Sequence, residues 1–368
     1  MLICSNCFSS RFLRTIIESY GEPGPCSLCE TSGTHCVPAA DLRPNFKPLI
    51  ECYGTPHWLD VGPPETNSLA GVMKVQKLSV FSERLSIARQ NEFLNLMIGP
   101  GGRSATEFWA SPLNAGILYG TSGWEYFCEE VKHRHRFSPN STVSELLMDA
   151  DRAHRDLKLK ITAGLSFYRA QAHLAAELGG ELPSKRLEAP PGRLATAGRA
   201  NPAGISYLYV ADNADTAIAE VRPYSGGFVS LAVVTALNDL RIFDLTAKFI
   251  LEYRDPFAID FLKEYKLAIL ASKMDEAFAE PIGPFTPDID YAPTQVAAEL
   301  IASAGYSGIR YRSSLDHGGF NYVFFDPAAF EVTYNRSVRV TQVKVAHEPH
   351  TFLSLGQVLS RMAQDSAH

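Results

Sequence analysis

The chain has 368 residues, of which 46% are hydrophobic and 20% are charged, an ordinary composition for a soluble globular protein of two or three domains. Its formal net charge of −6 and pI near 6.0 argue against binding of nucleic acid over the whole surface, because phosphate binding needs a basic face. The sequence shows no signal peptide and no run of about 18 apolar residues, so we predict a cytoplasmic protein without a membrane partner.

Two CxxC pairs mark the first segment, which we place at residues 1–55. Cys4 and Cys7 form one pair and Cys26 and Cys29 the other, with 18 residues between the pairs. Four thiolates at this spacing are typical of a closed, tetrahedral zinc site that stabilises a fold and leaves no position for water. Because a segment this rich in Gly and Pro buries little core of its own, zinc would supply folding energy.

Other interpretations of these cysteines stay open. One interpretation is that the cysteines are buried free thiols. Another is that they form a disulfide framework, which fits a reducing compartment less well. His35 or Cys36 is also close enough in sequence to replace one of the four ligands. Cys52 and Cys128 lack a partner motif, and we expect both in the hydrophobic core.

Residues 56–160 are expected to form a mainly helical domain. From Phe81 to about Leu159 the apolar residues recur at helical spacing, whereas 99–108 and 136–141 have the composition of connecting loops. The first loop, GPGGRSATEF, lacks the Gly-Lys-Ser/Thr ending of a P-loop, and no GxGxxG motif follows a predicted strand. Hydride transfer on a bound dinucleotide is therefore not expected.

Residues 161–346 are expected to form an α+β domain, followed by a C-terminal helical tail at 347–368. Predicted strands stand at 165–172, 205–211, 227–234, 239–245 and 321–326. Predicted helices stand at 215–222, 258–274 and 294–305.

A carboxylate in an apolar setting distinguishes residues 198–222, GRANPAGISYLYVADNADTAIAEVR. Strand alternation places Tyr207 and Tyr209 on one face, and Asp212 or Asn213 is expected to cap the helix that follows. Glu220 comes next to the buried side of that helix, near its end, where the macrodipole does not favour a negative charge. Such a carboxylate needs a partner or a function. Taken alone, it predicts a salt bridge to Arg199 or Arg222.

Three motifs in the same order resemble the RES domain. They are SFYRAQ at 166–171, the stretch just described with Pro223, and GIRYRSSLDHGGFNYVFFDP at 308–327. The resemblance implies an ADP-ribosyltransferase-like fold and NAD⁺ as a substrate that is hydrolysed or phosphorolysed, while some members transfer ADP-ribose to a protein. Many members are toxins paired with an Xre-type antitoxin. The CxxC segment with the helical region resembles the HEPN-associated extension of longer RES proteins.

The resemblance also implies which residues form the site. They are Arg169, Arg199, Tyr209, Glu220 and Ser313. Family members often have proline where Arg312 stands, so Ser314 is the alternative to Ser313.

These residue types suit cleavage of an N-glycosidic bond to a cationic leaving group. Arginines bind the pyrophosphate through planar, paired donors, and a tyrosine ring offers the nicotinamide a stacking face. Glu220 would hold the ribose hydroxyls and stabilise the positive charge that builds on C1 in the transition state. The serine would bind the nicotinamide amide or hold Glu220 in its rotamer. Asn321 anchors the ligand or caps its strand, and His317 contacts a phosphate or lies on a surface loop.

The resulting prediction is an NAD⁺ glycohydrolase or phosphorylase, a toxin or defence effector, that uses NAD⁺ as substrate and zinc as a structural ion. One alternative is an ADP-ribosyltransferase that modifies a protein. Another is a zinc-dependent module that binds a nucleotide or nucleic acid through the Cys segment and the basic cluster KHRHRF at 132–137, although a solvated helix end explains that cluster as well. Nucleic acid is not expected as a partner, and a homodimer stays open.

Overall fold

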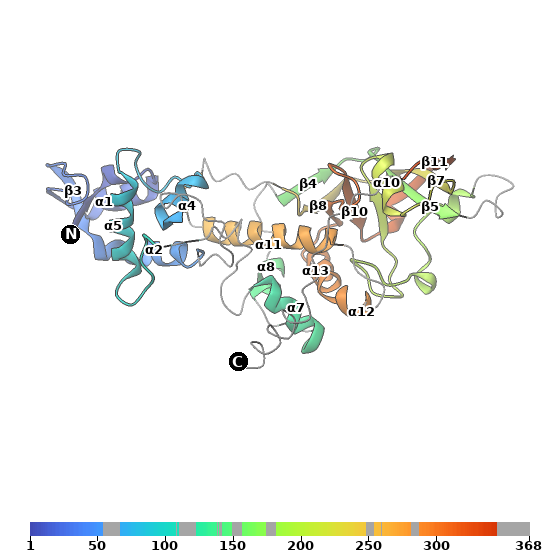
Figure 1. Ribbon diagram of the computed structural model, residues 1–368, viewed down its shortest axis with the longest axis horizontal. Helices are drawn as coiled ribbons and strands as arrows, with labels where there is room; N and C mark the ends of the chain where they lie inside the picture. The colour runs from blue at the N-terminus through green and yellow to red at the C-terminus, as the bar shows by residue number, and fades with distance from the viewer. Residues whose placement is uncertain are drawn as a thin grey trace, which may run out of the picture.

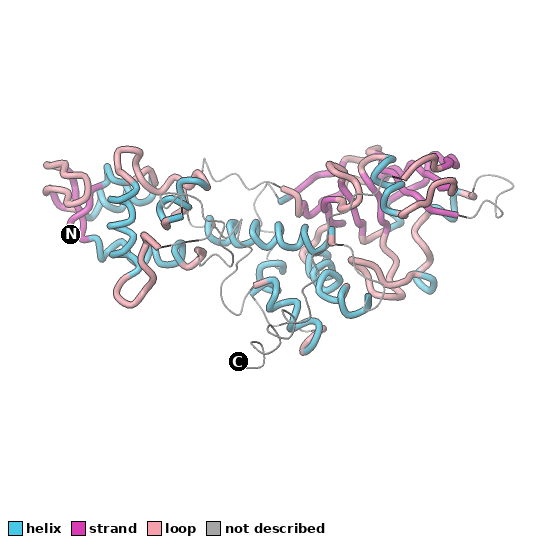
Figure 2. The backbone as a smooth tube through the Cα atoms, in the orientation of Figure 1, coloured by secondary structure: helices cyan, strands magenta, loops and turns pink. Residues whose placement is uncertain are grey.

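The computed structural model describes residues 1–53, 67–107, 109, 123–137, 139, 142–148, 157–173, 182–247, 254–258, 260–280 and 287–343. Strands gather at both ends of an elongated molecule, and helices lie between them (Figure 2). The small sheet belongs to the N-terminal end, the large sheet to the C-terminal half, and the long helix α11 runs from one toward the other (Figure 1). In the part of the chain that the structure describes, no helix has the length and apolar character needed to cross a membrane.

The N-terminal lobe combines a small sheet with short helices. Its strands are β1 (Leu2–Cys4), β2 (Glu22–Gly24) and β3 (Thr34–Pro38), antiparallel and in the order β1-β3-β2. Its helices are the 3₁₀ helices η1 (Ser5–Cys7) and η2 (Ala39–Leu42) and the α-helices α1 (Arg11–Tyr20), α2 (Arg43–Ile50), α4 (Leu69–Val75) and α5 (Ile87–Ile98). Side-chain caps start α1, α4 and α5, because Ser10, Ser68 and Ser86 each accept a backbone N–H of the first turn.

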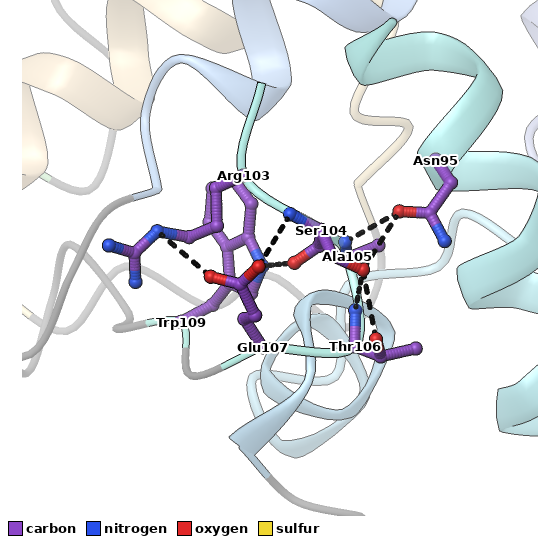
Figure 3. Close-up of polar contacts among 7 residues, drawn as sticks. All are labelled: Asn95, Arg103, Ser104, Ala105, Thr106, Glu107 and Trp109. Atoms are coloured by element: carbon purple, nitrogen blue, oxygen red, sulfur yellow. Dashed lines mark hydrogen bonds and ion pairs between the residues drawn. The ribbon is translucent and has the colours of Figure 1, made fainter. Parts of the chain in front are cut away.

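The loop predicted at 99–108 contains turns held by its own side chains. Asn95, on α5, accepts the N–H of Ala105 at 2.7 Å and the hydroxyl of Ser104 at 3.3 Å (Figure 3). Trp109 donates its indole N–H to the Ser104 carbonyl at 2.8 Å, and Glu107 accepts the Ser104 N–H at 3.3 Å. These contacts hold the turns of the stretch that was predicted to be a connecting loop.

The C-terminal half contains an eight-stranded sheet. Its order is β11-β7-β5-β6-β10-β9-β8-β4, and β8 and β9 are its parallel pair, while the other neighbours are antiparallel. The strands are β4 (Lys158–Ile161), β5 (Ser166–His173), β6 (Leu208–Ala211), β7 (Phe228–Ala236), β8 (Leu240–Asp244), β9 (Gly308–Arg312), β10 (Phe320–Phe324) and β11 (Phe330–Arg339).

The C-terminal half also contains α-helices and 3₁₀ helices. They are α7 (Trp124–His133), α8 (Thr142–Met148), α9 (Ser184–Leu187), η6 (Gly192–Leu194), α10 (Ala214–Glu220), α11 (Phe261–Ala279), α12 (Pro287–Asp290), α13 (Ala292–Ser303) and η7 (Pro327–Ala329). The α+β class predicted from the sequence is confirmed.

Helix α11 belongs to two hydrophobic cores. Phe261, Tyr265 and Ile269 are buried in the core of the N-terminal lobe, together with α2, α4 and α5. Met274 and Phe278 are buried in a second core with α7, α8, α13 and β9. The helices of the expected 56–160 region therefore divide between these two cores, and the domain bounds proposed above stay predictions.

The predicted strands and helices of the C-terminal half are found with shifted ends. The strand expected at 205–211 begins only at Leu208, and the helix expected at 258–274 extends to Ala279. Strands β4, β9 and β11 were not among the predicted strands, although apolar and polar residues alternate in each of them. The predicted tail helix at 347–368 lies outside the described residues.

Candidate active site and metal centre

The four cysteines of the two CxxC pairs meet in one cluster. The Sγ atoms of Cys4, Cys7, Cys26 and Cys29 all lie within 4.8 Å of one another. Cys4 Sγ is 3.4 Å from Cys29 Sγ and 3.8 Å from Cys7 Sγ, and Cys7 Sγ is 3.5 Å from Cys26 Sγ. A tetrahedral zinc ion with Zn–S bonds of about 2.3 Å separates its sulfurs by about 3.8 Å. The cluster therefore fits a tetrahedral metal centre.

The surroundings of the cluster suit thiolate ligands. The backbone N–H of Cys4 points to Cys26 Sγ at 3.4 Å, and Cys29 Sγ lies 3.2 Å from the Thr31 hydroxyl. Cys36 stands apart from the four, with its Sγ donating to the Thr34 carbonyl at 3.4 Å. All seven cysteines are free of disulfides, so the disulfide interpretation is wrong. The candidate ligand set is the one that the CxxC spacing predicted, without His35 or Cys36.

A cavity of about 330 Å³ opens where β5, β6, α10 and β10 converge. Its walls combine aromatic rings, small residues, two arginines and one carboxylate. The lining residues are Tyr168, Arg169, Ala170, Gly198, Arg199, Tyr209, Val210, Ala211, Ala217, Glu220, Val221, Tyr291, Tyr311 and Asn321. A cavity of this size and mixed lining is typical of a small-molecule site.

Glu220 is the last residue of α10, and its carboxylate lies at the cavity wall. Asn213 starts that helix by accepting the N–H of Thr216 at 2.8 Å, so one of the two predicted caps is confirmed. The Oε1 atom of Glu220 accepts the Ser313 hydroxyl at 2.7 Å and the Asn321 side-chain amide at 2.6 Å. Two neutral donors thus fix the carboxylate without neutralising its charge.

The salt-bridge interpretation of Glu220 is not supported. Arg199, Glu220 and Arg222 all belong to the described part of the chain, and no ion pair there joins Glu220 to either arginine. The guanidinium of Arg199 instead donates through Nη1 to the carbonyl of Glu280, at the end of α11. Among the described residues, the Glu220 carboxylate therefore has the neutral side chains of Ser313 and Asn321 as its hydrogen-bond partners.

Arg169 extends from β5 into the lining of the same cavity. Its Nη1 donates to the Tyr209 carbonyl at 2.7 Å, which holds the guanidinium against the neighbouring strand β6. Burial lowers the pKa of Arg169 from its ordinary value. A guanidinium carries five N–H donors in a planar fork, so this bond leaves further donors for a ligand.

The hydroxyl of Tyr209 holds the loop that carries Arg199. It donates to Asn201 Oδ1 at 2.7 Å and accepts the Ala200 N–H at 3.0 Å. Asn201 is only 3% exposed, and its amide donates to the carbonyls of Thr196, Pro202 and Ile205. Burial raises the pKa of Tyr209, so its phenol stays protonated and remains a donor.

Gly198 allows this loop to approach the tyrosine. A Cβ atom at Gly198 would lie 2.7 Å from Asn201 Oδ1 and 2.9 Å from the Tyr209 hydroxyl, which is too close for any larger residue. Gln295, on α13, donates to the carbonyls of Gly198 and Asn201 at 2.9 and 3.0 Å. The backbone around Arg199 is thus fixed from two sides. Sequence reasoning missed Asn201, Tyr291 and Tyr311, and the polar Asn between small residues in GRANPAG was the one available signal.

The third motif brings Ser313 to the site. Neither serine belongs to the cavity lining, but Ser313 is half-buried and donates to Glu220, whereas Ser314 is exposed, so the geometry favours Ser313. His317 is exposed and also outside the lining. Tyr207 packs against Phe325, with ring centroids 5.0 Å apart, away from the cavity. The structure brings Arg169, Arg199, Tyr209, Glu220, Ser313 and Asn321 together, and their roles stay predictions.

Comparison with known proteins adds the following findings. No curated protein matches this sequence. The crystal structure of the M. tuberculosis MbcT–MbcA toxin–antitoxin complex contains a chain that is 14% identical, with a TM-score of 0.33, over 54% of this chain and 94% of that one. The family model of the RES domain matches residues 166–343, a range that includes every residue placed at the cavity, and this chain therefore carries a RES domain.

Proposed function

We propose that this RES domain binds NAD⁺ in the cavity and cleaves the bond between nicotinamide and ribose. The observation that carries the proposal is the Glu220 carboxylate, held by Ser313 and Asn321 at the wall of a cavity that two arginines also line. The resemblance of the three motifs to RES proteins supports NAD⁺ as the substrate.

In the proposed complex the two arginines bind the pyrophosphate. Arg169 is fixed by the Tyr209 carbonyl and Arg199 by the Glu280 carbonyl, so both guanidinium groups are ordered before the ligand arrives. Preordered donors lose less conformational entropy on binding. The rings of Tyr209, Tyr291 and Tyr311 line the cavity and offer apolar faces to the nicotinamide, which carries a positive charge in NAD⁺.

Glu220 acts on the transition state in this proposal. As the bond between ribose C1 and the nicotinamide nitrogen breaks, its electron pair leaves with nicotinamide, which becomes neutral, and C1 becomes cationic. A carboxylate held at this place stabilises that charge and accepts the ribose hydroxyls. Water or inorganic phosphate then forms the new bond to C1 and loses a proton, which gives ADP-ribose or ADP-ribose 1″-phosphate.

The test is release of nicotinamide from NAD⁺ by the purified full chain, with inorganic phosphate absent and present. We expect release from the wild type and loss on the order of 10²–10³-fold in kcat for Glu220→Gln. No release from the wild type at any phosphate concentration sinks the proposal. Adenine-labelled NAD⁺ identifies the acceptor, because label retained on a protein would assign ADP-ribosyl transfer instead of hydrolysis or phosphorolysis.

We further propose that Cys4, Cys7, Cys26 and Cys29 hold a zinc ion. The ion would supply folding energy to a lobe with short strands and would take no part in the chemistry, because four protein ligands close its shell. Resemblance to RES toxins also leads us to propose that the chain is a toxin restrained by an Xre-type antitoxin. Co-expression with the reading frame beside its gene tests that partnership, and growth arrest that no neighbour relieves would contradict it.

A further inference from the structure

A carboxylate from α11 continues the hydrogen bonding of β9 at the point where its neighbour β8 stops. The register of β8 and β9 ends at Asp244 and Arg310, and the Arg310 carbonyl accepts the N–H of Leu245 at 3.0 Å. Two residues later, the Arg312 N–H donates to Asp275 Oδ1 at 2.8 Å, and the Arg312 side chain donates through Nε to Asp275 Oδ2. Asp275 therefore takes the place that a longer β8 would occupy.

Asp275 is buried on α11, between turns of the helix that pack into two hydrophobic cores. Its side chain is 1% exposed in the ion pair, whereas that of Arg312 is 58% exposed. Burial raises the pKa of Asp275, although its bonds with Arg312 oppose that shift. Met274 and Phe278 fix the surrounding turns of α11 in the core beneath the sheet, and Tyr265 and Ile269 fix the preceding turns in the N-terminal lobe. Burying a carboxylate costs free energy, so its placement at this strand end suggests a role beyond stability.

Ser313, the residue that follows Arg312, connects this strand end to Glu220. Ser313 leaves β9, continues the pairing by donating its N–H to the Gly319 carbonyl at 3.0 Å, and donates its hydroxyl to Glu220 at 2.7 Å. Its Oγ also accepts the N–H groups of Leu315 and Asp316, each at 3.2 Å. The direction of the hydroxyl thus depends on where β9 ends.

We propose that Asp275 is a positioning residue, which holds Arg312 so that the Ser313 hydroxyl meets the Glu220 carboxylate. This inference rests on the proposed function and deepens it, because it connects a helix outside the cavity lining to the carboxylate that acts in the reaction. Helix α11 contacts the site at a second place as well, because the carbonyl of Glu280, just past the helix, accepts a hydrogen bond from Arg199.

The strand β9 offers a matched control. Arg310 pairs with Asp244 at 3.1 Å, and its guanidinium lies 3.8 Å from the centroid of the Phe320 ring. This ion pair is also partly buried and also joins β9 to a neighbouring element, but it does not hold the residue that precedes Ser313. Asp244→Asn and Asp275→Asn each remove one carboxylate charge from an ion pair with an arginine of β9. Only Asp275 contacts Arg312, the residue that precedes Ser313.

Activity and a double-mutant cycle form the first test. We expect Asp275→Asn to lower kcat for nicotinamide release about 10-fold or more with little change in KM, and Asp244→Asn to change kcat less than about 2-fold. Because Asp275 acts through Ser313, the double variant D275N/S313A should be no slower than Ser313→Ala alone. Losses that add in the double variant, or equal losses in the two single Asn variants, overturn the inference.

Hydrogen exchange tests the placement without any reaction. The amides of Leu315 and Asp316 bond to Ser313 Oγ, so their exchange reports where that oxygen lies. We expect faster exchange at both amides in Asp275→Asn and wild-type exchange in Asp244→Asn. Unchanged exchange in Asp275→Asn overturns the inference even if the enzyme is active. A wild type that releases no nicotinamide instead overturns the proposed function, whatever the exchange shows.

Discussion

Ser313 donates its hydroxyl to the carboxylate of Glu220 at 2.7 Å, across 93 positions of the chain. The serine follows β9 and the glutamate ends α10, so the bond joins the end of a strand to the end of a helix. Asn321 on β10 donates to the same oxygen at 2.6 Å. Both donors bind the same carboxylate oxygen, Oε1, so the proposed binding of ribose hydroxyls would use the other oxygen, Oε2.

Glu220→Gln tests the carboxylate with almost no change in shape. The amide oxygen can still accept from Ser313 and Asn321, so we expect a folded protein with an unfolding midpoint close to that of the wild type, and kcat lower on the order of 10²–10³-fold. Steady-state nicotinamide release and thermal unfolding measure the two effects. Asp215→Asn, on the exposed side of the same helix, is the control and should keep full activity. An active Glu220→Gln would mean that its negative charge has no part in the reaction.

Ser313→Ala and Ser314→Ala separate the two adjacent serines. Removing the Ser313 hydroxyl breaks its bond to Glu220 and leaves the amides of Leu315 and Asp316 without their acceptor. We expect kcat to fall about 10- to 100-fold, since a charge-assisted hydrogen bond contributes about 1.5–3 kcal/mol. Ser314 is exposed, and its substitution should leave kcat within about 2-fold of the wild type. The reverse order of effects would assign the family serine to Ser314.

Tyr209→Phe removes a hydroxyl while keeping the ring. The buried Asn201 Oδ1 and Ala200 N–H each lose a partner, so we expect the free energy of unfolding to fall by about 1–3 kcal/mol. The looser loop around Arg199 should raise KM for NAD⁺ more than it lowers kcat. Denaturant unfolding and steady-state kinetics provide both numbers. Tyr207→Phe, whose ring packs outside the cavity, is the control, and equal changes in KM for the two variants would argue against the loop-holding role.

Cys7→Ser tests the metal centre. Cys7 is fully buried within the cluster, so its loss should abolish zinc binding and lower the unfolding temperature of the protein. Metal analysis of the purified chain should show a single bound zinc ion in the wild type and in Cys36→Ser, which changes a buried cysteine outside the cluster. Zinc retained by Cys7→Ser, or absent from freshly purified wild type, contradicts the assignment.

The sequence by itself predicted the cysteine cluster and the class of fold, whereas the residues of the candidate active site came from the resemblance of three motifs to the RES domain. Paired cysteines at CxxC spacing predict a shared centre because two residues between ligands suit a tight turn around one ion. Periodicity in 198–222 predicted a strand and then a helix that ends near Glu220, and the structure has β6 and α10 there. These features follow from local backbone geometry and from which face of an element is buried, and a sequence displays both directly.

Only the tertiary structure decided which partners these residues have. The acceptor of Arg199 is a carbonyl at the end of α11, the partner of the Tyr209 hydroxyl is Asn201, and Asp275 bonds a strand end far away in the chain. Each contact depends on the order of strands in the sheet and on where each strand stops, which local periodicity does not specify. The same reason explains why a lone Glu220 suggested a salt bridge: a charge in the sequence shows that a partner is needed, and only the packed fold brought Ser313 and Asn321 to it.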